Sequence, residues 1–432
     1  MNLFSALWLC FALLVAIGKY QHELDLPTCL TGVSLSKRQP DSVPASEDLT
    51  DLVQSGQDEL YYGPVLVGAK TSKTFTCDFD TGSSDLDIPG PDCTPANGCP
   101  EAQNLKYDNS GTSAGNSTSV TYGPGMVTGD NYIDTVCVAG LCAPNTGFVS
   151  LNMSSGIDQN PPTCLMGMGF PEIAQSGLPP FFNNLINQGH LDDNSKEFSF
   201  CLGRAASNTQ GKSKLTLGGR DTNSFKGEVT EVPVTKRGYW KVQVDGMRVN
   251  NGTILLPTIA EALSKADGAI DTGTTIILAP YAAAQGIAAA IPGAIPIALP
   301  LGLTGGVGNA MILANAVTAY PCNTDATVSM VFNGKPFEIN PLDLSFGQLT
   351  GSIGQCFTSN GIFSSTILKL LSSLFDGKKG FPYCVASIAG ASITGVQPFY
   401  VVGDTFLKNW YSIFNQDNPA APYVGFAEAN CQ

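Results

Sequence analysis

The sequence predicts an all-β, bilobal protein. Its 432 residues are enough for two hydrophobic cores, and 43% of them are hydrophobic. The 47 Gly and 28 Pro interrupt the chain often, which is typical of many short strands rather than long helices. A short acidic signature also occurs twice, as Asp80-Thr-Gly-Ser-Ser and as Asp271-Thr-Gly-Thr-Thr, each after an apolar run. The repeat predicts two similar halves that each deliver one carboxylate to a shared site.

The net charge of the chain limits the kinds of ligand that it is expected to bind. The net charge of −14 and the pI of about 4.5 argue against nucleic acid as a ligand, because like charges repel. Lys, Arg and His are scarce, so little of the chain would gain positive charge as the pH falls. We therefore expect an acidic working environment. The alternative is that the chain is acidic only in the way that many secreted proteins are.

The N-terminal segment is typical of a targeting sequence. Residues 3–17 are apolar but too few to span a membrane, and Ala16-Ile17-Gly18 offers small residues for signal peptidase. We expect a signal peptide at residues 1–18, although it lacks a Lys or Arg near its start. The dibasic pair Lys37-Arg38 then predicts a propeptide at residues 19–38, with a latest end near residue 57. The alternative is that these are two unrelated surface charges.

Strand-like runs bounded by Gly and Pro fill the first lobe, expected at residues 58–225. They are Tyr62–Val67, Thr74–Phe79, Val120–Tyr122, Tyr132–Val138, Phe198–Leu202 and Leu215–Leu217. One helix is expected at Pro180–Gln188, where Phe181, Leu185 and Ile186 share a face. Gly189 would end this helix.

The polar stretch at residues 221–236 is expected to separate the lobes, because it carries Gly227 and Pro233. A second β-rich lobe is then expected at residues 233–432, with its own acidic signature.

One segment of the second lobe is unusual because no charged residue lies between Asp271 and Asp325. Its prolines, three of them within residues 291–303, exclude an ordinary membrane-spanning helix. The segment is either a buried or loop-covering insertion, or an apolar rim beside a cleft that contacts substrate.

Cysteine usage supports export. Of 13 cysteines, Cys10 would leave with the signal peptide and Cys29 lies in the expected propeptide, so an odd number remains. At least one thiol would then be unpaired or intermolecular. Sequence spacing predicts disulfides joining Cys93 to Cys99, Cys137 to Cys142 and, around a longer loop, Cys322 to Cys356. Pairing stays open for Cys77, Cys164, Cys201, Cys384 and Cys431.

Metal binding is the competing interpretation of the cysteines. It is disfavoured because there is no CxxC pair and only His190 lies outside the expected leader. We expect no metal and no other cofactor. Three glycosylation sequons, starting at Asn116, Asn152 and Asn251, would mark the surface if they carry glycans.

The two acidic turns predict a specific chemistry. A carboxylate after an apolar strand is costly to bury unless hydrogen bonds hold it, and the Gly two residues later lets a backbone N–H face it. If the lobes face each other, Asp80 and Asp271 would share one proton, because two close carboxylates do not both ionise easily. Such a pair can activate a water for amide hydrolysis, as in the aspartic proteases that serve as the standard example.

Two other interpretations compete with this one. A single Asp-Thr-Gly is most often an ordinary turn, but two copies in apolar settings, one in each half, favour catalysis. A glycosidase also uses two carboxylates, although it does not require paired Asp-Thr-Gly turns.

The chain resembles the pepsin-like aspartic proteases from about residue 58 to residue 429. Besides both Asp-Thr-Gly motifs, the similarity rests on short motifs that are weak singly and specific in this order. They are Tyr61-Tyr-Gly63, the hairpin at residues 120–129, Leu165-Met-Gly-Met-Gly169, residues 181–189, Leu215-Thr-Leu-Gly-Gly219, Val232-Pro-Val-Thr235, Gly238-Tyr-Trp240 and Val402-Gly-Asp404.

The resemblance implies a pepsin-like fold of two β-barrel-like lobes with a central substrate cleft and a β-hairpin flap. It also implies an endopeptidase that is favoured at acid pH. By this similarity Asp80 and Asp271 correspond to the catalytic pair and Tyr122 to the flap tyrosine. Ser83 and Thr274 correspond to hydroxyls that bind the carboxylates, Gly82 and Gly273 to the turns, and Gly123 to a glycine that lets the flap move.

The sequence departs from the family at Asp87, where members usually carry a Trp that binds the flap tyrosine. A carboxylate there could accept a hydrogen bond from Tyr122, but it adds negative charge near the pair. The hypothesis is an altered flap and a shifted pH optimum. The expected propeptide is also short and poor in Lys and Arg, which puts the family's usual inhibition by a basic prosegment in doubt.

The function expected from the sequence is a secreted, monomeric aspartic endopeptidase that cleaves polypeptides and has no membrane anchor. The rival from another class is a catalytically weak or silent pepsin-like protein that binds a partner. A structural cell-wall protein is more distant, because the chain shows no Ser/Thr-rich or hydrophobic tail.

Overall fold

The computed structural model describes residues 44–54, 57–122, 125–155, 162–253, 266–298, 304–307, 310–348, 382–393 and 398–432. These residues belong to one compact unit, Asp41–Gln432. The expected signal peptide and propeptide at residues 1–38 lie outside the described residues. So do Gly123 and Cys356.

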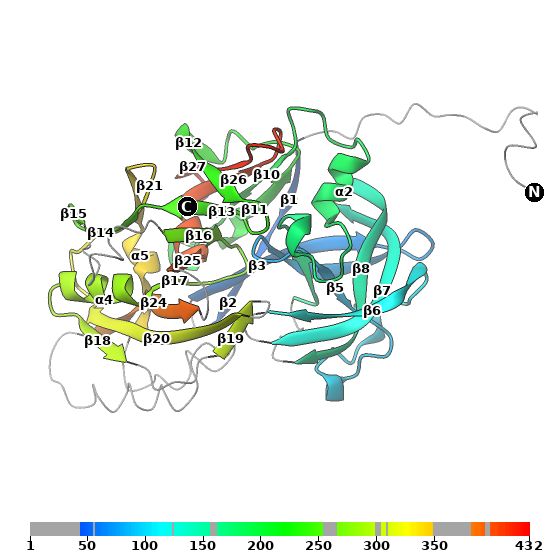
Figure 1. Cartoon of the computed structure of the whole chain (residues 1–432), viewed down its shortest axis with the longest axis horizontal. Coiled ribbons are helices and arrows are strands. Elements are labelled where there is room, and N and C mark those ends of the chain that lie inside the picture. The colour runs from blue at the N-terminus through cyan, green and yellow to red at the C-terminus, as the bar shows by residue number, and fades with distance from the viewer. Residues whose placement is uncertain are drawn as a thin grey trace, which may run out of the picture. The chain divides into compact units, whose positions relative to one another are not determined.

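The predicted all-β fold is confirmed, and the described strands form three sheets (Figure 1). The first sheet has eight strands and belongs to the N-terminal half. In spatial order they are β2 (Thr50–Gln54), β3 (Gln57–Val67), β4 (Lys73–Asp80), β9 (Cys164–Gly167), β5 (Leu86–Pro89), β8 (Leu141–Ser155), β7 (Met126–Val138) and β6 (Thr112–Thr121). The runs predicted in the first lobe all contribute to strands, although Tyr122 lies just past the end of β6.

The second sheet has fifteen strands and joins segments from both ends of the chain. Its main path is β1 (Ala45–Asp48), β11 (Lys214–Leu217), β10 (Glu197–Cys201), β26 (Trp410–Asn415), β27 (Tyr423–Ala429), β12 (Phe225–Lys236), β13 (Lys241–Val244), β16 (Ala266–Ile270), β25 (Phe399–Val402), β17 (Ile277–Pro280), β24 (Tyr383–Ile393), β20 (Ala310–Pro321) and β18 (Ile295–Ala298). Two further strands, β19 (Thr304–Val307) and β23 (Ser345–Gln348), pair with β20 and β24.

The third sheet belongs to the second half, and the helices are distributed over both halves. The sheet has four strands, β15 (Gly252–Thr253), β14 (Gly246–Val249), β21 (Val328–Phe332) and β22 (Lys335–Ile339). The α-helices are α2 (Phe181–Asn187), α4 (Tyr281–Ala290), α5 (Pro341–Leu344) and α7 (Asp404–Leu407), and the 3-10 helices are η1 (Pro95–Asn97), η2 (Gln103–Leu105), η3 (Pro171–Ile173), η4 (Ala205–Ser207) and η5 (Gln210–Lys212). Among the described residues no helix is long and apolar enough to cross a membrane.

The helix predicted before Gly189 is confirmed as α2. Phe181 and Leu185 are buried, and Gly189 adopts a φ of 72° that favours glycine.

The internal repeat extends from the motif to the sheet. In the N-terminal half β4 pairs in parallel with β9, β9 with β5 antiparallel, and β5 with β8 in parallel. In the C-terminal half β16, β25, β17 and β24 repeat the same three pairings in the same order. Each Asp-Thr-Gly turn therefore leaves its sheet at the same topological position.

The boundary predicted at residues 221–236 is not a linker. Most of it is β12, a long strand that pairs with both β27 and β13. Most side chains of β12 are exposed or half-buried, so the polar composition reflected a solvated strand face rather than a loop. Gly227 lies where the register with β27 shifts, with a φ of 73°.

The described part of the uncharged segment is largely a buried layer, which favours the first of the two interpretations. Helix α4, which the sequence did not predict, buries Ala283, Ala284, Ile287 and Ala288. It packs against β20 and β24, and β18 adds an edge strand to β20. Residues 299–303 lie outside the described residues.

Five disulfides cross-link the described residues. The predicted bonds joining Cys93 to Cys99 and Cys137 to Cys142 are confirmed. The prediction of Cys322 with Cys356 is wrong, because Cys322 is bonded to Cys384. The pairing of β20 with β24 sets Tyr320 opposite Cys384 and brings the next turn alongside it, a contact that sequence spacing could not reveal. Two bonds left open by the sequence join Cys77 to Cys164 and Cys201 to Cys431.

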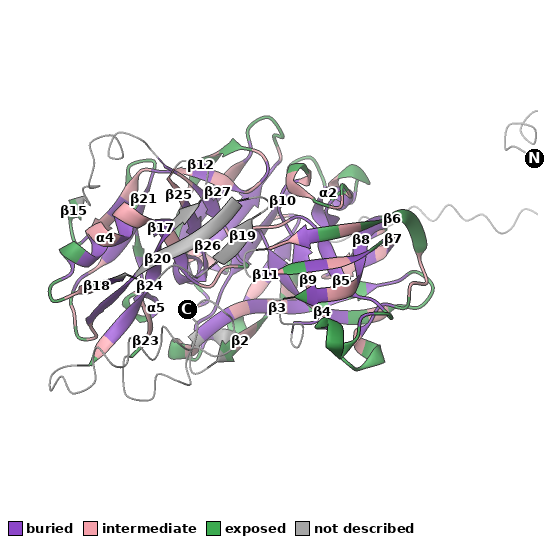
Figure 2. Ribbon diagram, turned by 60° about the horizontal axis from the view of Figure 1, so that its bottom comes forward, coloured by how far each residue is buried: buried purple, intermediate pink, exposed green. Residues whose placement is uncertain are grey.

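Buried residues, purple in Figure 2, run along strands of both halves. They include charged side chains as well as apolar ones. Lys408, at the end of α7, lies 2.7 Å from Asp58 and 2.9 Å from Asp343. The guanidinium of Arg204 pairs with the same Asp343 carboxylate. Because these four groups come from distant parts of the chain, the network ties β3 to α5 and α7.

Candidate active site

The two acidic turns have the same local geometry. The backbone N–H of Gly82 donates to Asp80 Oδ1 at 2.7 Å, and that of Gly273 donates to Asp271 Oδ1 at 3.0 Å. The prediction that each glycine N–H faces its own carboxylate is therefore confirmed. These bonds compensate carboxylates that have been drawn away from bulk water.

The threonines of the two motifs lock the turns together across the lobes. Thr81 N–H donates to Thr272 Oγ1 at 3.0 Å, and Thr272 N–H donates to Thr81 Oγ1 at 3.0 Å. Each hydroxyl also donates to a backbone carbonyl of the opposite lobe, Thr81 to Ile270 at 2.8 Å and Thr272 to Phe79 at 2.5 Å. Both threonines are buried. Sequence analysis assigned them no role, although their identical place in both copies was the available signal.

Each glycine also touches the opposite carboxylate. A Cβ atom at Gly82 would lie 2.5 Å from Asp271 Oδ2, and one at Gly273 would lie 2.4 Å from Asp80 Oδ1. Separations this short are not tolerated between non-bonded atoms, so only glycine lets the two turns approach. The close approach brings Asp80 and Asp271 to one site.

The paired carboxylates interact electrostatically. Burial and the neighbouring charge of Asp80 raise the pKa of Asp271 well above its ordinary value, against the lowering effect of its bonds from Thr274 and Gly273. Two acids coupled in this way titrate as a unit, and Asp271 is the member that retains the proton.

The hydroxyls after the two turns behave differently. Thr274 Oγ1 donates to Asp271 Oδ2 at 2.9 Å, as the resemblance implied. Ser83 Oγ is buried without a hydrogen-bond partner, so the structure does not show the bond expected between Ser83 and its carboxylate. The neighbouring hydroxyl of Ser84 points elsewhere and donates to Phe170 O.

Tyr122 lies at the end of the β6–β7 hairpin and reaches Asp87. Its N–H donates to Gly125 O at 2.8 Å, and its hydroxyl donates to Asp87 Oδ2. Burial and then the charge of Asp87 raise the pKa of Tyr122, with smaller contributions from Asp85 and Asp80. The predicted acceptor role of Asp87 is confirmed. Burial, followed by the charge of Asp85, raises the pKa of Asp87 itself well above its ordinary value.

A third carboxylate, Asp78, lies beside the pair and was not identified from the sequence. Side chains alternate along a strand, so Asp78 shares the face of β4 that carries Asp80. It is 7% exposed, and its Oδ1 has no hydrogen-bond partner. Burial and then the charges of Asp80 and Asp271 raise its pKa. The available signal was an acid two residues before the motif, between Cys77 and Phe79.

Tyr239 also belongs to the surroundings of the pair. Burial and the charges of Asp271 and Asp80 raise the pKa of Tyr239 to about 12. Its neighbour Trp240 is fully buried and donates to Met168 O at 2.9 Å, which anchors this segment beneath the first turn.

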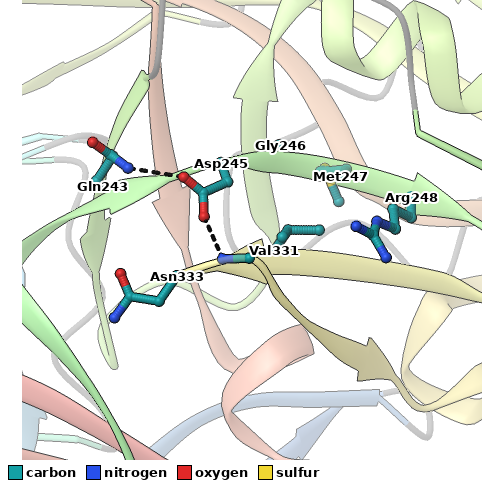
Figure 3. Close-up of a pocket in the computed structure, with 8 residues that line it drawn as sticks. Gln243, Asp245, Gly246, Met247, Arg248, Val331 and Asn333 are labelled. Carbon is teal, nitrogen blue, oxygen red and sulfur yellow. Dashed lines mark hydrogen bonds between the residues drawn. The ribbon is translucent and has the colours of Figure 1, made fainter.

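A pocket of about 410 Å³ lies elsewhere, between β14 and β21 of the second half (Figure 3). Asp245 is its carboxylate, and both oxygens are engaged, by Gln243 Nε2 and by the N–H of Gly334, each at 2.8 Å. It lacks the paired acids of the two turns. Among the described residues no group of three His, Cys, Asp or Glu suits a metal ion.

The sequons lie on strands or turns with accessible side chains. Asn116 and Asn251 are exposed and Asn152 is half-buried. The geometry thus leaves room for a glycan at Asn116 and Asn251 in particular.

Comparison with known proteins agrees with this geometry. The family model described as eukaryotic aspartyl protease matches residues 60–429. An aspartic protease of Phaffia rhodozyma is 30% identical over 87% of this chain and 78% of its own length. Rhizopuspepsin of Rhizopus chinensis is 30% identical over 96% of this chain and 88% of its own length. Cathepsin D of Gallus gallus is 28% identical over 89% and 84%, respectively.

Proposed function

The chain belongs to the eukaryotic aspartyl protease family, whose members are endopeptidases, and from that premise we propose that it hydrolyses polypeptides through Asp80 and Asp271. The observation that carries the proposal is the cross-bonded pair of turns that brings the two carboxylates together. No cofactor is part of the proposal.

The two carboxylates have distinct roles in this proposal. Asp271, whose raised pKa keeps its proton, donates that proton to the carbonyl oxygen of the scissile peptide bond. Asp80 accepts a proton from a water molecule whose oxygen attacks the carbonyl carbon. The resulting tetrahedral intermediate collapses when the C–N bond breaks. Asp80 then gives the proton it took from water to the leaving nitrogen, and Asp271 regains a proton from the hydroxyl group that formed on the carbonyl oxygen. Activity should fall as the pH rises through the pKa of Asp271, because the proton on Asp271 is then lost.

Substrate contacts are proposed on the hairpin side and at the turns. Tyr122 is held near the pair by Asp87, and this supports a role in covering bound peptide. Thr274 donates a hydrogen bond to Asp271 and so stabilises the ionised form of that carboxyl group. The further proposed contacts are Gly82, Ser83, Gly123 and Gly273.

The compartment and the mature form are also proposals. Five disulfides support an oxidising, secretory environment and a secreted enzyme. A monomer is proposed as well. Strand β1 pairs with β11 from Ala45 to Asp48, and Leu49 is 4% exposed. Maturation near residue 38 would keep this strand, whereas cleavage near residue 57 would remove it. We therefore favour the earlier end for the propeptide.

The test is cleavage of a peptide library between about pH 2.5 and 7 by the processed protein, beside its Asp80→Asn and Asp271→Asn variants. We expect an acid-pH activity that falls at least about a thousandfold in either variant, as loss of a general acid or base requires. The matched control is Asp245→Asn, an acid in the pocket of Figure 3. A wild-type protein that is folded and processed but inactive would instead favour the binding-protein alternative.

A further inference from the structure

The loop after η3 holds the end of strand β6. Gln175 Oε1 accepts from Thr121 N–H at 3.1 Å, and Gln175 Nε2 donates to Thr121 O at 3.1 Å. The side-chain amide therefore pairs with the backbone as a neighbouring strand would. Strand β6 lies at the edge of its sheet, so this side of it has no strand partner.

Asp85 fixes the position of that loop. Its Oδ2 accepts from Gln175 N–H at 2.8 Å, while its Oδ1 accepts from Ser176 N–H at 3.0 Å and from the Ser176 hydroxyl. Asp85 is only 3% exposed. With both oxygens engaged in a buried setting, Asp85 orients Gln175 toward Thr121.

Two consecutive hairpin residues are thus held by one short acidic run. Asp87 binds the hydroxyl of Tyr122 directly, and Asp85 holds Thr121 through Gln175. These contacts are additional to the ladder between β6 and β7, in which Thr121 lies opposite Met126. They connect the hairpin to the segment that follows the first Asp-Thr-Gly turn.

We propose that Gln175 is a positioning residue that sets the placement of Tyr122 over the site by pairing with the backbone of Thr121. The proposal deepens the proposed function and rests on it. Loss of this pairing would leave Tyr122 held by Asp87 and by the ladder of its own hairpin, and would reduce the fraction of molecules in the binding-competent arrangement. The apparent KM therefore rises, with a smaller change in kcat.

The discriminating variant is Gln175→Glu. A protonated carboxyl group has the same shape as the amide and supplies one donor and one acceptor, whereas a carboxylate supplies acceptors only and would face Thr121 O. The charged groups of this loop are Asp85 and Glu172, with Arg237 paired to Glu172 at 2.7 Å. The variant should therefore approach wild type at low pH and weaken as the introduced group ionises.

The matched control is Gln188→Glu. Gln188 Nε2 also donates to a backbone carbonyl, that of Pro144 at 2.7 Å, but it lies at the end of α2 and makes no contact with the hairpin. We expect Gln188→Glu to keep the wild-type KM at every pH.

Kinetics are measured at about pH 3 and 5.5, always relative to wild type at the same pH. Gln175→Glu should lie within about twofold of wild type at pH 3 and show a KM about two- to tenfold higher at pH 5.5, the worth of one or two net hydrogen bonds. Gln175→Ala should raise KM at both values. An unchanged KM in Gln175→Ala, or an equal change in Gln188→Glu, would overturn the proposal.

Hydrogen exchange at the Thr121 amide separates this proposal from the catalytic one. That N–H donates to Gln175, so its exchange should be about fivefold faster in Gln175→Ala and unchanged in Gln188→Glu. Because this readout needs no activity, a protein without peptidase activity would still test the contact. Unchanged exchange at Thr121 would refute the positioning role even in an active enzyme.

Discussion

The two Asp-Thr-Gly turns have nearly the same backbone and different surroundings. Both glycines donate to their own aspartate, and the two threonines exchange equivalent bonds across the lobes. The hydroxyls that follow are not equivalent, because Thr274 binds Asp271 and Ser83 binds neither carboxylate. The backbone symmetry thus brings two acids together. The side chains break this symmetry, because the bond from Thr274 lowers the pKa of Asp271 against the larger raising effects of burial and of the charge of Asp80.

The contrast extends to neighbouring charges. The first turn is surrounded by Asp78, Asp85 and Asp87, all buried. The second turn opens a segment without charged residues, whose described part forms a buried layer around α4. The segment around the first turn therefore concentrates titrating groups, and the segment that the second turn opens supplies an apolar scaffold.

Replacing the glycine of either Asp-Thr-Gly turn by alanine should displace the carboxylate of the opposite turn. Gly82→Ala would push Asp271 away, and Gly273→Ala would push Asp80 away, because the new Cβ overlaps the opposite carboxylate. We expect kcat/KM to fall about a hundredfold or more, since a displacement near 1 Å is that costly. Gly211→Ala, a control at a position with open space around it, should leave kcat unchanged. If Gly82→Ala or Gly273→Ala were as active as wild type, catalysis would not depend on the close approach of the two turns.

The hydroxyl asymmetry predicts unequal effects of two similar substitutions. Thr274→Val removes a hydrogen bond that lowers the pKa of Asp271, so that pKa should rise further. We expect kcat/KM to fall about fivefold with an alkaline limb shifted to higher pH. Ser83→Ala should change kcat/KM by less than about twofold. Equal effects in the pH–rate profiles of the two variants would contradict the asymmetry.

Asp87 should make the hairpin respond to pH. Burial keeps Asp87 protonated at acid pH, and its ionisation at higher pH would strengthen the bond from Tyr122, since ionic hydrogen bonds are about twice as strong as neutral ones. Asp87→Asn and Asp87→Trp cannot ionise. Their kcat/KM relative to wild type should be constant at low pH and differ by about threefold near pH 6. A constant ratio across the whole profile would remove Asp87 from the pH response.

Buried acids from both halves should limit stability at higher pH. Burial, with the nearby Asp58, raises the pKa of Asp51 to about 9, and burial also raises the pKa of Asp78 and Asp404. A group whose pKa is higher in the folded state stabilises below its unfolded value, and this stability is lost as the pH rises. Asp58 acts oppositely, because Lys408 lowers its pKa against the effect of burial.

The three acids with raised pKa values outweigh Asp58 in their effect on stability. We therefore expect Tm to fall by at least about 5 °C between pH 4 and 8. Asp51→Asn should flatten the dependence measured by calorimetry. A Tm that rises between pH 4 and 8 would contradict this prediction.

Some contacts were beyond any argument from sequence spacing. Cys322 lies closer in sequence to Cys356, yet its partner is Cys384, because β20 and β24 pair over a long intervening segment. The polar composition of residues 221–236 predicts a boundary between the lobes, but it does not reveal strand β12, because a solvated strand face and a loop have the same composition. Gln175 carried no signal either, since its role depends on Asp85 turning a distant loop toward β6.

The all-β class and the repeated acidic turn were readable from residue types and their order, because strand periodicity and turn chemistry are local properties. The acceptor role of Asp87 was expected only from the resemblance to the pepsin-like family, in which a Trp usually binds the flap tyrosine. Whether two distant turns meet, which hydroxyl binds its carboxylate and where the proton resides were decided by tertiary structure. Those features depend on separations of a few ångströms between residues far apart in the chain, and on burial, which changes the energy of a charge far more than its sequence neighbours do.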